Sequence, residues 1–346
     1  MPRNAQRSTP VIKDVAKLAG VSAPTVSRYL NGTANVNEEK RKRIAQAIKL
    51  LGYKPSIVAR ALANKEMDSV MVFAANSGTF STNMTNIGVE RGAQEKNYLF
   101  AVTSLSEKRL DEVQQMVQMA LGANPAGVIV YEYDRAGAEA LRYIPDDMPL
   151  VIVGGNAGEG PYQVINSERD GGRAMTEYLL NLGHQTVYHV ARAEGPSGNT
   201  RTNGWRDALV AAGVPIPEIV RVSSTDLEEA VEAGRALGRR SDVTAVFAGN
   251  DETAIAVING LREVGRRVPE DVSVVGFDDR QFAPLWKPAL TSYRQNFNDM
   301  GERAFAMLYE QIQAKRAGEE PPQSRLETVQ GRMIVRDSAC ARVLDR

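Results

Sequence analysis

The stretch VIKDVAKLAGVSAPTVSRYLNG, residues 11–32, decides the fold of the first part of this chain. Its first half predicts an amphipathic helix, because apolar residues recur at spacings of three and four: Ile12, Val15, Ala16 and Ala19. Thr9 can cap this helix, and Pro10 suits its first position because that position needs no N–H. Gly20 can end the helix in a left-handed conformation.

A second helix follows after a turn of a few residues, with Ser22 as its N-cap and Val26 and Leu30 as inward positions. Helices joined by so short a turn cross steeply, and the first turn of the second helix then projects outward. A third helix is expected next, with these capping, inward and end positions: Asn37, Ile44, Ile48, Leu51 and Gly52. This is helix-turn-helix spacing, which brings short side chains into the major groove of DNA.

The distribution of charge also favours a nucleic-acid partner. Of the 42 basic and 42 acidic residues in the 346-residue chain, residues 1–65 hold 13 and 3, a net charge of +10; the remainder holds 29 and 39, a net charge of −10. A basic head on an acidic body is typical of a DNA-binding module joined to another kind of domain. The outward face of the second helix offers small and hydroxylated residues with one arginine: Ala23, Pro24, Thr25, Ser27 and Arg28.

From residue 69 onward, apolar strands alternate with amphipathic helices, which predicts parallel α/β sheets with helices on both faces. The strand candidates are SVMVFAA, YLFAVTS, AGVIVYE, PLVIVGG, TVYHVAR, TAVFAGND and VSVVGFDD. We expect the first five to form one sheet, and a break near residues 163–170 to start a second. Ligands of such sheets bind beyond the carboxyl ends of the strands, where polar residues gather: Asn76, Tyr131, Asn250, Asp251, Asp278 and Asp279.

The motifs of common enzymes are missing from the sequence. It contains no Walker A loop, no G-x-G-x-x-G after the first strand and no G-x-S-x-G elbow. His184 and His189 have no obvious nucleophile as a partner, and the single Cys340 excludes a disulfide framework and a cysteine-based metal cluster. Adjacent strand residues point to opposite faces, so one of Asp278 and Asp279 is expected to face the ligand while the other caps a turn or helix. We expect neither an enzyme nor a cofactor.

The head resembles the headpiece of the lactose-repressor (LacI/GalR) family of bacterial transcription regulators. The elements D-V-A-x-x-A-G-V-S, T-V-S-R, L-G-Y-x-P and A-x-x-L occur in the family's order and spacing, although Val11 stands where the family usually has a capping Thr. The resemblance implies that Ala23, Pro24 and Arg28 read bases. It also implies these phosphate contacts: Ser22, Thr25, Ser27, Asn31 and Asn37. Since Pro24 can only pack against a base, Arg28 is expected to carry much of the hydrogen-bonded readout.

The segment IVARALANK after Pro55 predicts a short hinge helix that Ser56 can cap. Such a short helix is marginal alone in water, because helix nucleation is costly. The similar segment of the family folds when paired with its copy in the minor groove, where a leucine wedges between base pairs and bends the DNA. Leu62 matches that leucine and Ala59 matches the small residue facing the partner copy; a plain linker helix is the alternative.

The body resembles the periplasmic-binding-protein-like effector domain of the same family, through the runs NLGHQTV, GPSGNTRTNGWRDAL, AVFAGNDETAIAVINGLREVGRRVPEDVSVVGFDD and LTSYRQ. The resemblance implies a small-molecule effector bound between two lobes by these residues: Asn76, Tyr131, Asn166, Asn199, Arg201, Asn250, Asp278 and Gln295. Carboxylate and guanidinium groups can clamp neighbouring hydroxyls, and Phe80, Tyr131 or Trp205 can cover an apolar sugar face. A sugar is therefore expected, with a purine or nucleoside as the alternative; Trp205 occupies a helical position more typical of a core.

Together these features predict a transcription factor, expected to be a repressor, whose binding to a pseudo-palindromic operator is controlled by an effector. A single recognition helix reads only a half-site and the hinge needs its symmetric copy, so a homodimer is the minimum assembly. The tail GRMIVRDSACARVLDR lacks a heptad repeat that would favour a tetramer, and predicts a terminal strand or turn that closes the second lobe. The sequence leaves open whether the effector releases or strengthens DNA binding.

The expected domains are a headpiece (1–54), a hinge (55–66) and an effector and dimerisation domain (67–346), with a first lobe of about 67–165 and 297–326 and a second of about 167–295 and 328–346. The sequence has neither an apolar run long enough to span a membrane nor a secretion signal, which predicts a cytoplasmic protein, nucleoid-associated when bound to DNA. A solute-binding receptor would need export, and a nucleotide-dependent enzyme would need a phosphate loop. Both are disfavoured alternatives.

Overall fold

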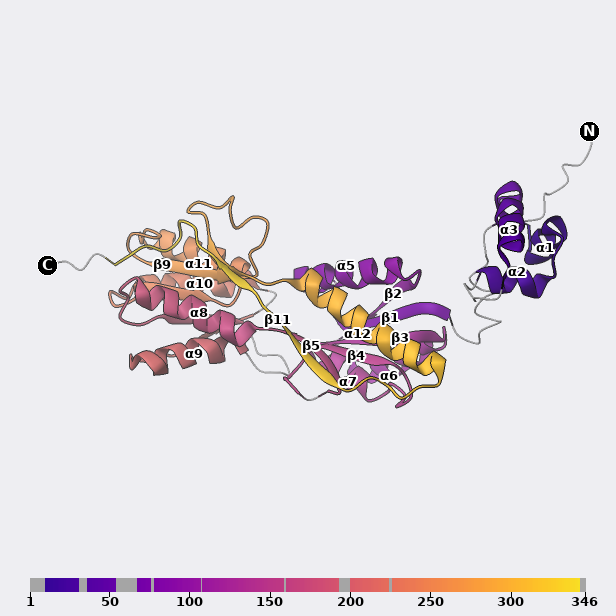
Figure 1. Cartoon of the computed structure of the whole chain (residues 1–346). Helices are drawn as coiled ribbons and strands as arrows, with labels where there is room; N and C mark the ends of the chain where they lie inside the picture. Colours follow the sequence, from indigo (N-terminus) through magenta and orange to yellow (C-terminus); the bar gives the residue numbers. More distant parts are fainter. Residues whose placement is uncertain are drawn as a thin grey trace, which may run out of the picture. The chain divides into compact units, whose positions relative to one another are not determined.

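The computed structural model describes residues 10–30, 36–53, 67–75, 78–106, 108–158, 160–192, 200–223 and 226–342. The chain forms two compact units, Met1–Asp68 and Ser69–Arg346 (Figure 1). Several positions singled out from the sequence lie outside the described residues: Thr9, Asn31, Ser56, Ala59, Leu62, Asn76 and Asn199.

The described residues of the first unit form three helices, α1 (Ile12–Ala19), α2 (Ala23–Leu30) and α3 (Glu38–Leu51). Their apolar stripes meet in one small core: Val15, Ala16, Ala19, Val26, Val36, Ile44 and Ala47. Gly20 and Gly52 adopt left-handed conformations, with φ of 64° and 59°, and end α1 and α3 as predicted. The helix-turn-helix pattern predicted from the sequence is confirmed.

The predicted start of the first helix is wrong. The helix begins at Ile12 rather than Pro10, with Val11 at the N-cap position. Asp14 accounts for the difference, because its carboxylate accepts a hydrogen bond from the backbone N–H of Val11 at 2.9 Å. An acidic side chain in the first turn satisfies a free donor and interacts favourably with the positive end of the helix dipole. A valine can therefore stand where a hydroxyl side chain would otherwise cap the helix.

From Met67 onward, the described residues form two six-stranded sheets, one in each lobe. The first lobe has the strand order β11-β5-β4-β3-β1-β2, with bounds β1 (Met67–Ala75), β2 (Leu99–Leu105), β3 (Pro125–Glu132), β4 (Leu150–Gly154), β5 (Tyr162–Asn166) and β11 (Arg325–Val329). The second has the order β12-β10-β9-β8-β6-β7, with bounds β6 (Tyr188–Arg192), β7 (Val220–Val222), β8 (Ala245–Ala248), β9 (Ser273–Phe277), β10 (Thr291–Arg294) and β12 (Arg332–Ile334). The described pairs are parallel except β10 with β12, which confirms the predicted fold class.

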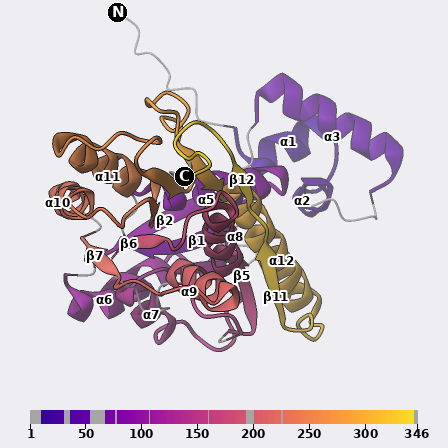
Figure 2. The same ribbon diagram turned by 90° about the vertical axis from the view of Figure 1, so that its left-hand side faces the viewer.

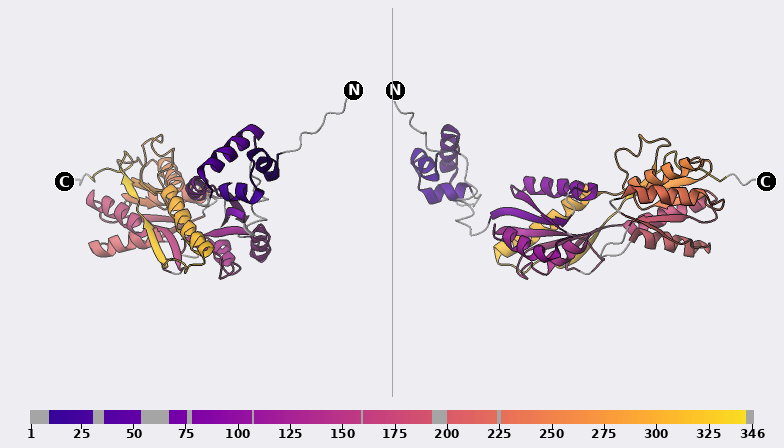
Figure 3. Two further views of the ribbon diagram at one scale, coloured as in Figure 1. Left: turned by 45° about the vertical axis from the view of Figure 1, so that its right-hand side comes forward. Right: turned by 180° about the vertical axis from the view of Figure 1, so that it is seen from behind.

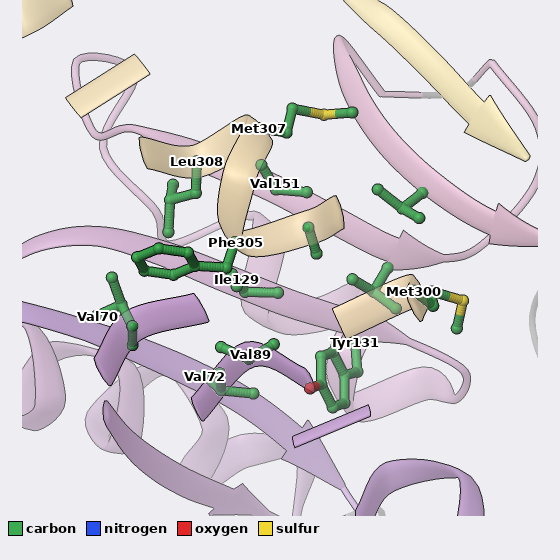
Figure 4. Packing of buried hydrophobic residues seen from close by; sticks show 14 of the residues in the cluster. Val70, Val72, Val89, Ile129, Tyr131, Val151, Met300, Phe305, Met307 and Leu308 are labelled. Carbon is green, nitrogen blue, oxygen red and sulfur yellow. The ribbon is translucent and has the colours of Figure 1, made fainter. Parts of the chain in front are cut away.

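Helices cover both faces of each sheet (Figures 1 and 3). In the first lobe, α5 (Phe80–Glu95) and α12 (Phe297–Ala317) cover one face, while η1 (Leu110–Glu112), α6 (Val113–Leu121) and α7 (Arg135–Leu141) lie at the other. In the second, α8 (Glu168–Asn181) and α9 (Thr200–Ala212) form one layer, and α10 (Leu227–Gly238) and α11 (Asp251–Glu263) form the other. Figure 2 shows α8 beside α9, and Figure 4 shows Val89 and Phe305 packed over Val70 and Val72.

The assignment of strands to sheets needs a correction. The fifth predicted strand, TVYHVAR, contains β6 and belongs to the second sheet, whereas the fifth strand of the first sheet in chain order is β5. Sequence pattern missed β5 because it is short and only two of its five residues are buried. In the described part of the chain, the backbone crosses between the sheets three times, near residues 167, 296 and 330. The tail forms β12 beside β10 in the second sheet, which confirms the predicted terminal strand.

Candidate functional site

The first candidate surface is on the helical head, around α2. Four of the predicted DNA contacts are exposed: Ser22, Pro24, Arg28 and Asn37. Three are half-buried: Ala23, Thr25 and Ser27. Ala23 packs against the core of the head, and the hydroxyls of Ser22 and Thr25 share a hydrogen bond of 2.8 Å. The first turn of α2 is thus anchored at its base and presents Pro24 and Arg28 to solvent.

Asn37 also has a structural task. Its Oδ1 accepts hydrogen bonds from the backbone N–H groups of Glu39, at 2.8 Å, and Lys40, at 3.3 Å. It therefore caps α3, as the sequence predicts. Its carbonyl oxygen accepts in the cap, which leaves the side-chain NH₂ group, the donor of the amide, to bind a phosphate.

The second candidate site is in the second lobe, where Arg201 lies in the first turn of α9. The Nη2 atom of Arg201 lies 2.7 Å from Oε1 of Glu168 and 3.4 Å from Oδ1 of Asp278. Its Nη1 atom donates to the carbonyl oxygen of Gly249 at 2.5 Å, and its guanidinium lies 4.3 Å from the ring centroid of Phe277. These contacts use both ends of the guanidinium and hold it in one position.

Close packing of α8 against α9 brings Glu168 to Arg201. A Cβ on Gly204 would lie 1.9 Å from the carbonyl oxygen of Arg169, and a Cβ on Gly172 would lie 2.3 Å from that of Arg201. Both distances are far shorter than any real Cβ contact, so only glycine allows these two helices to approach so closely. The pairing of Glu168 with Arg201 is therefore built into the helix crossing.

Asp278 and Gln295 complete the cluster. Nε2 of Gln295 donates to Oδ1 of Asp278 at 2.6 Å, and the Gln295 residue is only 7% exposed. Among the described residues, neither Oε1 of Gln295 nor Oδ1 of Asn166 has a hydrogen-bond partner, although both atoms are buried. Both atoms are acceptors, and Oε1 of Gln295, on the side chain that contacts Asp278, offers an unsatisfied acceptor to a ligand that carries N–H or O–H donors.

The prediction that Asp278 and Asp279 divide across a strand is wrong in detail. Strand β9 ends at Phe277, and both aspartates follow it with left-handed conformations, at φ of 95° and 49°. Asp278 turns toward Arg201, whereas Asp279 is buried in ion pairs with Arg294, at 2.5 Å, and Arg336, at 2.7 Å. The chain turns away after the strand, so strand alternation does not govern these two residues; Asp279 pairs with cations rather than capping a helix.

Two predicted effector residues make contacts within the protein. The ring of Tyr131 is buried in the core of the first lobe, 1% exposed, and its hydroxyl donates to Oδ1 of Asn86 at 2.8 Å (Figure 4). Asn250 is the N-cap of α11 and accepts the N–H of Thr253 at 3.0 Å. Trp205 is fully buried and donates to the carbonyl oxygen of Val187 at 2.8 Å, which confirms its core position. The structure therefore brings together Arg201, Asp278 and Gln295 from the predicted set.

The first lobe contributes aromatic side chains next to this cluster. The guanidinium of Arg280, from the second lobe, lies 4.4 Å from the ring centroid of Phe80, at the start of α5 in the first lobe. Phe80 is half-buried and packs edge-on against Phe297, and Arg280 is also paired with Glu252. Phe80 is thus the predicted aromatic residue that meets the second lobe.

Sequence reasoning missed three residues here: Glu168, Arg280 and Tyr133. Burial raises the pKa of Tyr133, and the charge of Glu168 raises it further. An acidic residue at the start of a helix is common because it interacts favourably with the helix dipole. The sequence around Glu168 therefore did not indicate that it pairs with Arg201, 33 residues away.

The ionisation of the cluster follows from its contacts. Burial acts to raise the pKa of Glu168, but the charge and hydrogen bond of Arg201, helped by Thr200, outweigh burial and lower it. Glu168 therefore stays ionised. Burial also raises the pKa of Asp251 to about 8 and lowers the pKa of His189 to about 4. His189 is bonded to the Phe247 carbonyl and the Thr202 hydroxyl inside the lobe.

Two further findings concern the described residues alone. No helix there is both long and apolar enough to pass through a membrane. No group of three or more His, Cys, Asp or Glu side chains in the described ranges is placed to hold a metal ion.

A helix-turn-helix head followed by two parallel α/β lobes defines a DNA-binding transcription regulator with an effector domain. Residues 11–56 match the family described as bacterial regulatory proteins, lacI family, and residues 176–339 match the periplasmic binding protein-like domain. The HTH-type transcriptional regulator CelR of Thermobifida fusca is 32% identical over 344 residues, which cover 96% of this chain and 99% of CelR. The chain therefore belongs to the LacI family, whose members are transcription regulators and not enzymes.

Other relatives agree with this assignment. The HTH-type transcriptional repressor PurR of Pasteurella multocida is 30% identical over 311 residues, covering 88% of this chain and 92% of PurR. A structure of the Lac repressor dimer bound to operator and the anti-inducer ONPF has the same fold, with a TM-score of 0.80 at 24% identity over 96% of this chain and all of that one. A complex of the regulator CelR with cellobiose matches at a TM-score of 0.68 and 29% identity, over 95% of this chain and all of that one.

Proposed function

We propose that this protein is a transcriptional repressor that binds a pseudo-palindromic operator as a homodimer and is controlled by a sugar bound between its two lobes. The observation that carries the proposal is the cluster of Arg201, Asp278 and Gln295, set where the chain crosses between the sheets. Ligands of open parallel sheets bind beyond the carboxyl ends of the strands, and Asp278 directly follows β9.

A sugar suits this chemistry better than a flat base. A carboxylate, a guanidinium and amide acceptors can bind neighbouring hydroxyls, and Phe80 can cover an apolar ring face. The relative CelR, whose complex with cellobiose is known, supports the same class of ligand. We include Asn166 in the proposed effector site because its buried acceptor has no partner among the described residues. Four more residues are included by resemblance to the family alone: Asn76, Tyr131, Asn199 and Asn250.

The effector is identified by calorimetry with a panel of neutral sugars, including cellobiose, and of nucleobases and nucleosides. We expect a sugar to bind and to change the affinity of the protein for operator DNA selected from a random pool. Binding of a nucleobase alone would establish the purine alternative. Failure of every small molecule to change operator affinity would contradict control by an effector.

In the head, we propose that Arg28 reads bases while Ala23 and Pro24 pack in the major groove. We propose phosphate contacts for Ser22, Thr25, Ser27, Asn31 and Asn37, and minor-groove contacts for Ser56, Ala59 and Leu62. Arg28→Ala should cost about 1–3 kcal/mol at the operator and much less on random DNA. Lys42→Ala removes another exposed cation of the head, and it should weaken binding to the operator and to random DNA equally.

A homodimer is proposed because a single recognition helix reads only half of a palindrome. Light scattering of the DNA-free protein should give about twice the chain mass, and operators with altered half-site spacing should lose affinity. A stable tetramer, or equal affinity for a single half-site, would contradict this assembly.

A further inference from the structure

Arg201 already has its counter-ions within the protein. Its Nη2 atom faces the carboxylates of Glu168, at 2.7 Å, and Asp278, at 3.4 Å, and its Nη1 atom is bonded to the Gly249 carbonyl. A guanidinium in this state has little capacity left to bind a phosphate or carboxylate in the bidentate geometry that such anions favour. Any anionic ligand would first have to displace Glu168.

Glu168 is held firmly in place. Its Oε2 atom accepts a hydrogen bond from the Thr200 hydroxyl at 2.7 Å, while its Oε1 atom accepts from Arg201 at 2.7 Å. The glycine contact between Gly172 and the Arg201 carbonyl fixes the helix crossing one turn away. The Arg201 charge keeps the pKa of Glu168 low despite burial, so a negative charge stays beside the candidate effector site.

Two buried acceptors, one on Gln295 beside Asp278 and one on Asn166 at the end of β5, can accept hydrogen bonds from a ligand that reaches them. Buried Oε1 of Gln295 and Oδ1 of Asn166 have no hydrogen-bond partner among the described residues. A phosphate dianion brings acceptor oxygens and more negative charge, so it would leave these acceptors unsatisfied and be repelled by Glu168 and Asp278. The guanidinium groups of Arg192 and Arg201 lie among the same charges, and the two carboxylates already face them. A neutral polyol brings hydroxyl donors, which satisfy such acceptors.

We propose that Glu168 is a specificity-determining residue that restricts the effector to uncharged, hydroxyl-rich molecules and excludes phosphorylated or carboxylated ones. This proposal rests on the proposed function, because it places the effector beside Arg201. A purely structural Glu168 would stabilise the α8–α9 contact without any influence on which anions bind, and that difference can be measured.

Inorganic phosphate is the probe, because it tests access to Arg201 without knowledge of the natural effector. Unfolding temperature and calorimetry are compared in phosphate and in chloride at equal ionic strength. We expect wild type to show no phosphate-specific stabilisation. Glu168→Gln keeps the size and one acceptor of the side chain but removes its charge. We expect it to bind phosphate at least about tenfold more tightly than wild type, a change of about 1.4 kcal/mol.

Three further variants separate the charge of Glu168 from its packing. Glu177→Gln removes a carboxylate from the same helix, in an exposed pair with Arg173, and should leave phosphate binding unchanged. Glu168→Asp keeps the charge and should also gain nothing. Adding Arg201→Ala to Glu168→Gln should abolish the gained phosphate binding, since Arg201 is the group that is released.

Phosphate binding by wild type that depends on Arg201 would overturn the proposal, even if Glu168→Gln failed to fold. A folded Glu168→Gln protein with no gain in phosphate affinity would overturn it as well. Neither result bears on whether a neutral sugar changes operator binding, so the proposed function stands or falls separately, on the calorimetric panel and the operator titration.

Discussion

The two lobes of the body share one plan but differ at the edges where they meet. Each has a six-stranded sheet covered by helices, with corresponding strand orders. The second lobe places Glu168, Arg201 and Asp278 at its crossover edge, while the first lobe offers the rings of Phe80 and Tyr133. The shared topology therefore does not fix which side chains stand at these edges. Here the second lobe supplies charged side chains and the first lobe supplies aromatic ones.

The helix layers show what the two lobes have in common. Helix pairs cross at facing glycines in both lobes: a Cβ on Gly301 of α12 would lie 2.1 Å from the Thr85 carbonyl, much as one on Gly204 of α9 would meet Arg169. What is shared between the lobes is therefore packing, and what differs is the polar edge.

Arg201→Ala should give the largest effect. It leaves the buried carboxylate of Asp278 and the half-buried carboxylate of Glu168 without the cation that contacts both of them. Breaking a fully buried pair costs about 3–5 kcal/mol, which is the upper bound for this change. Effector binding should be lost while the head still binds DNA, as calorimetry and operator titration will show. Arg173→Ala, which breaks an exposed pair on α8, should change stability by less than about 1 kcal/mol. A normal effector response from Arg201→Ala would contradict the role of the charged residues in effector binding.

Gly204→Ala should destabilise the second lobe by roughly 2–3 kcal/mol. Helix propensity alone predicts a gain of about 1 kcal/mol, but the new Cβ would meet backbone at 1.9 Å and force α8 and α9 apart. Denaturant unfolding measures the loss. Gly301→Ala should cause a similar loss in the first lobe and leave effector affinity intact, whereas Gly204→Ala should weaken it.

Gly78→Ala is the matched control, because a Cβ there meets no atom within 4 Å. Its stability should stay close to that of wild type. A stabilised Gly204→Ala protein would show that the helix pair can shift at little cost, and the packing argument would fail.

Phe80→Ala tests the aromatic edge and should weaken effector binding by about 1–2 kcal/mol, the range expected for the loss of a ring contact. It also removes the ring on which Arg280 lies, 4.4 Å from the centroid. Phe80→Leu keeps apolar bulk without the ring and should fall between the two proteins in calorimetric titration. Unchanged affinity in Phe80→Ala would place the effector wholly against the second lobe.

Acidification should remove the stabilisation that comes from burying a neutral His189, and this contribution is the smallest of the four effects. Burial lowers the pKa of His189 from an ordinary 6.5 to about 4, so the unfolded chain binds its proton more readily between these values. The stabilisation is complete above pH 6.5 and is lost as pH falls toward 4. Between pH 7.5 and 5.5 the loss should be about 1 kcal/mol.

His189→Gln keeps hydrogen-bonding groups near the Phe247 carbonyl and the Thr202 hydroxyl but does not titrate. The difference between the unfolding curves of wild type and this variant isolates His189 from Asp251, whose pKa burial raises to about 8. Asp251 acts in the opposite sense, since a raised pKa of a carboxyl destabilises the fold as pH rises. Parallel curves for wild type and His189→Gln would contradict the assignment.

The head was largely predictable because its signals are local. Asn37 and Gly52 mark the ends of α3 within a few residues of the apolar stripe that they bound, and both roles are confirmed. The predicted start of α1 was wrong, and the cause is also local: Asp14 accepts the hydrogen bond from the backbone N–H of Val11 in place of the expected upstream cap. In the body, long buried strands such as β1 and β3 were recognisable, while β5 and β7 were too short and too little buried to stand out.

The sequence by itself determined which residues form the helix-turn-helix head, that two parallel α/β lobes follow, and that Arg201 and Asp278 belong to motifs of the effector domain. Those conclusions depend on periodicity, caps and short motifs, which a chain carries in its local order. Only the tertiary structure decided that Glu168 pairs with Arg201, that Tyr131 is buried and that Arg280 meets Phe80. These pairs join residues far apart in the chain, and the crossing of glycine-bearing helices and the paths between the sheets, rather than sequence spacing, bring them within contact.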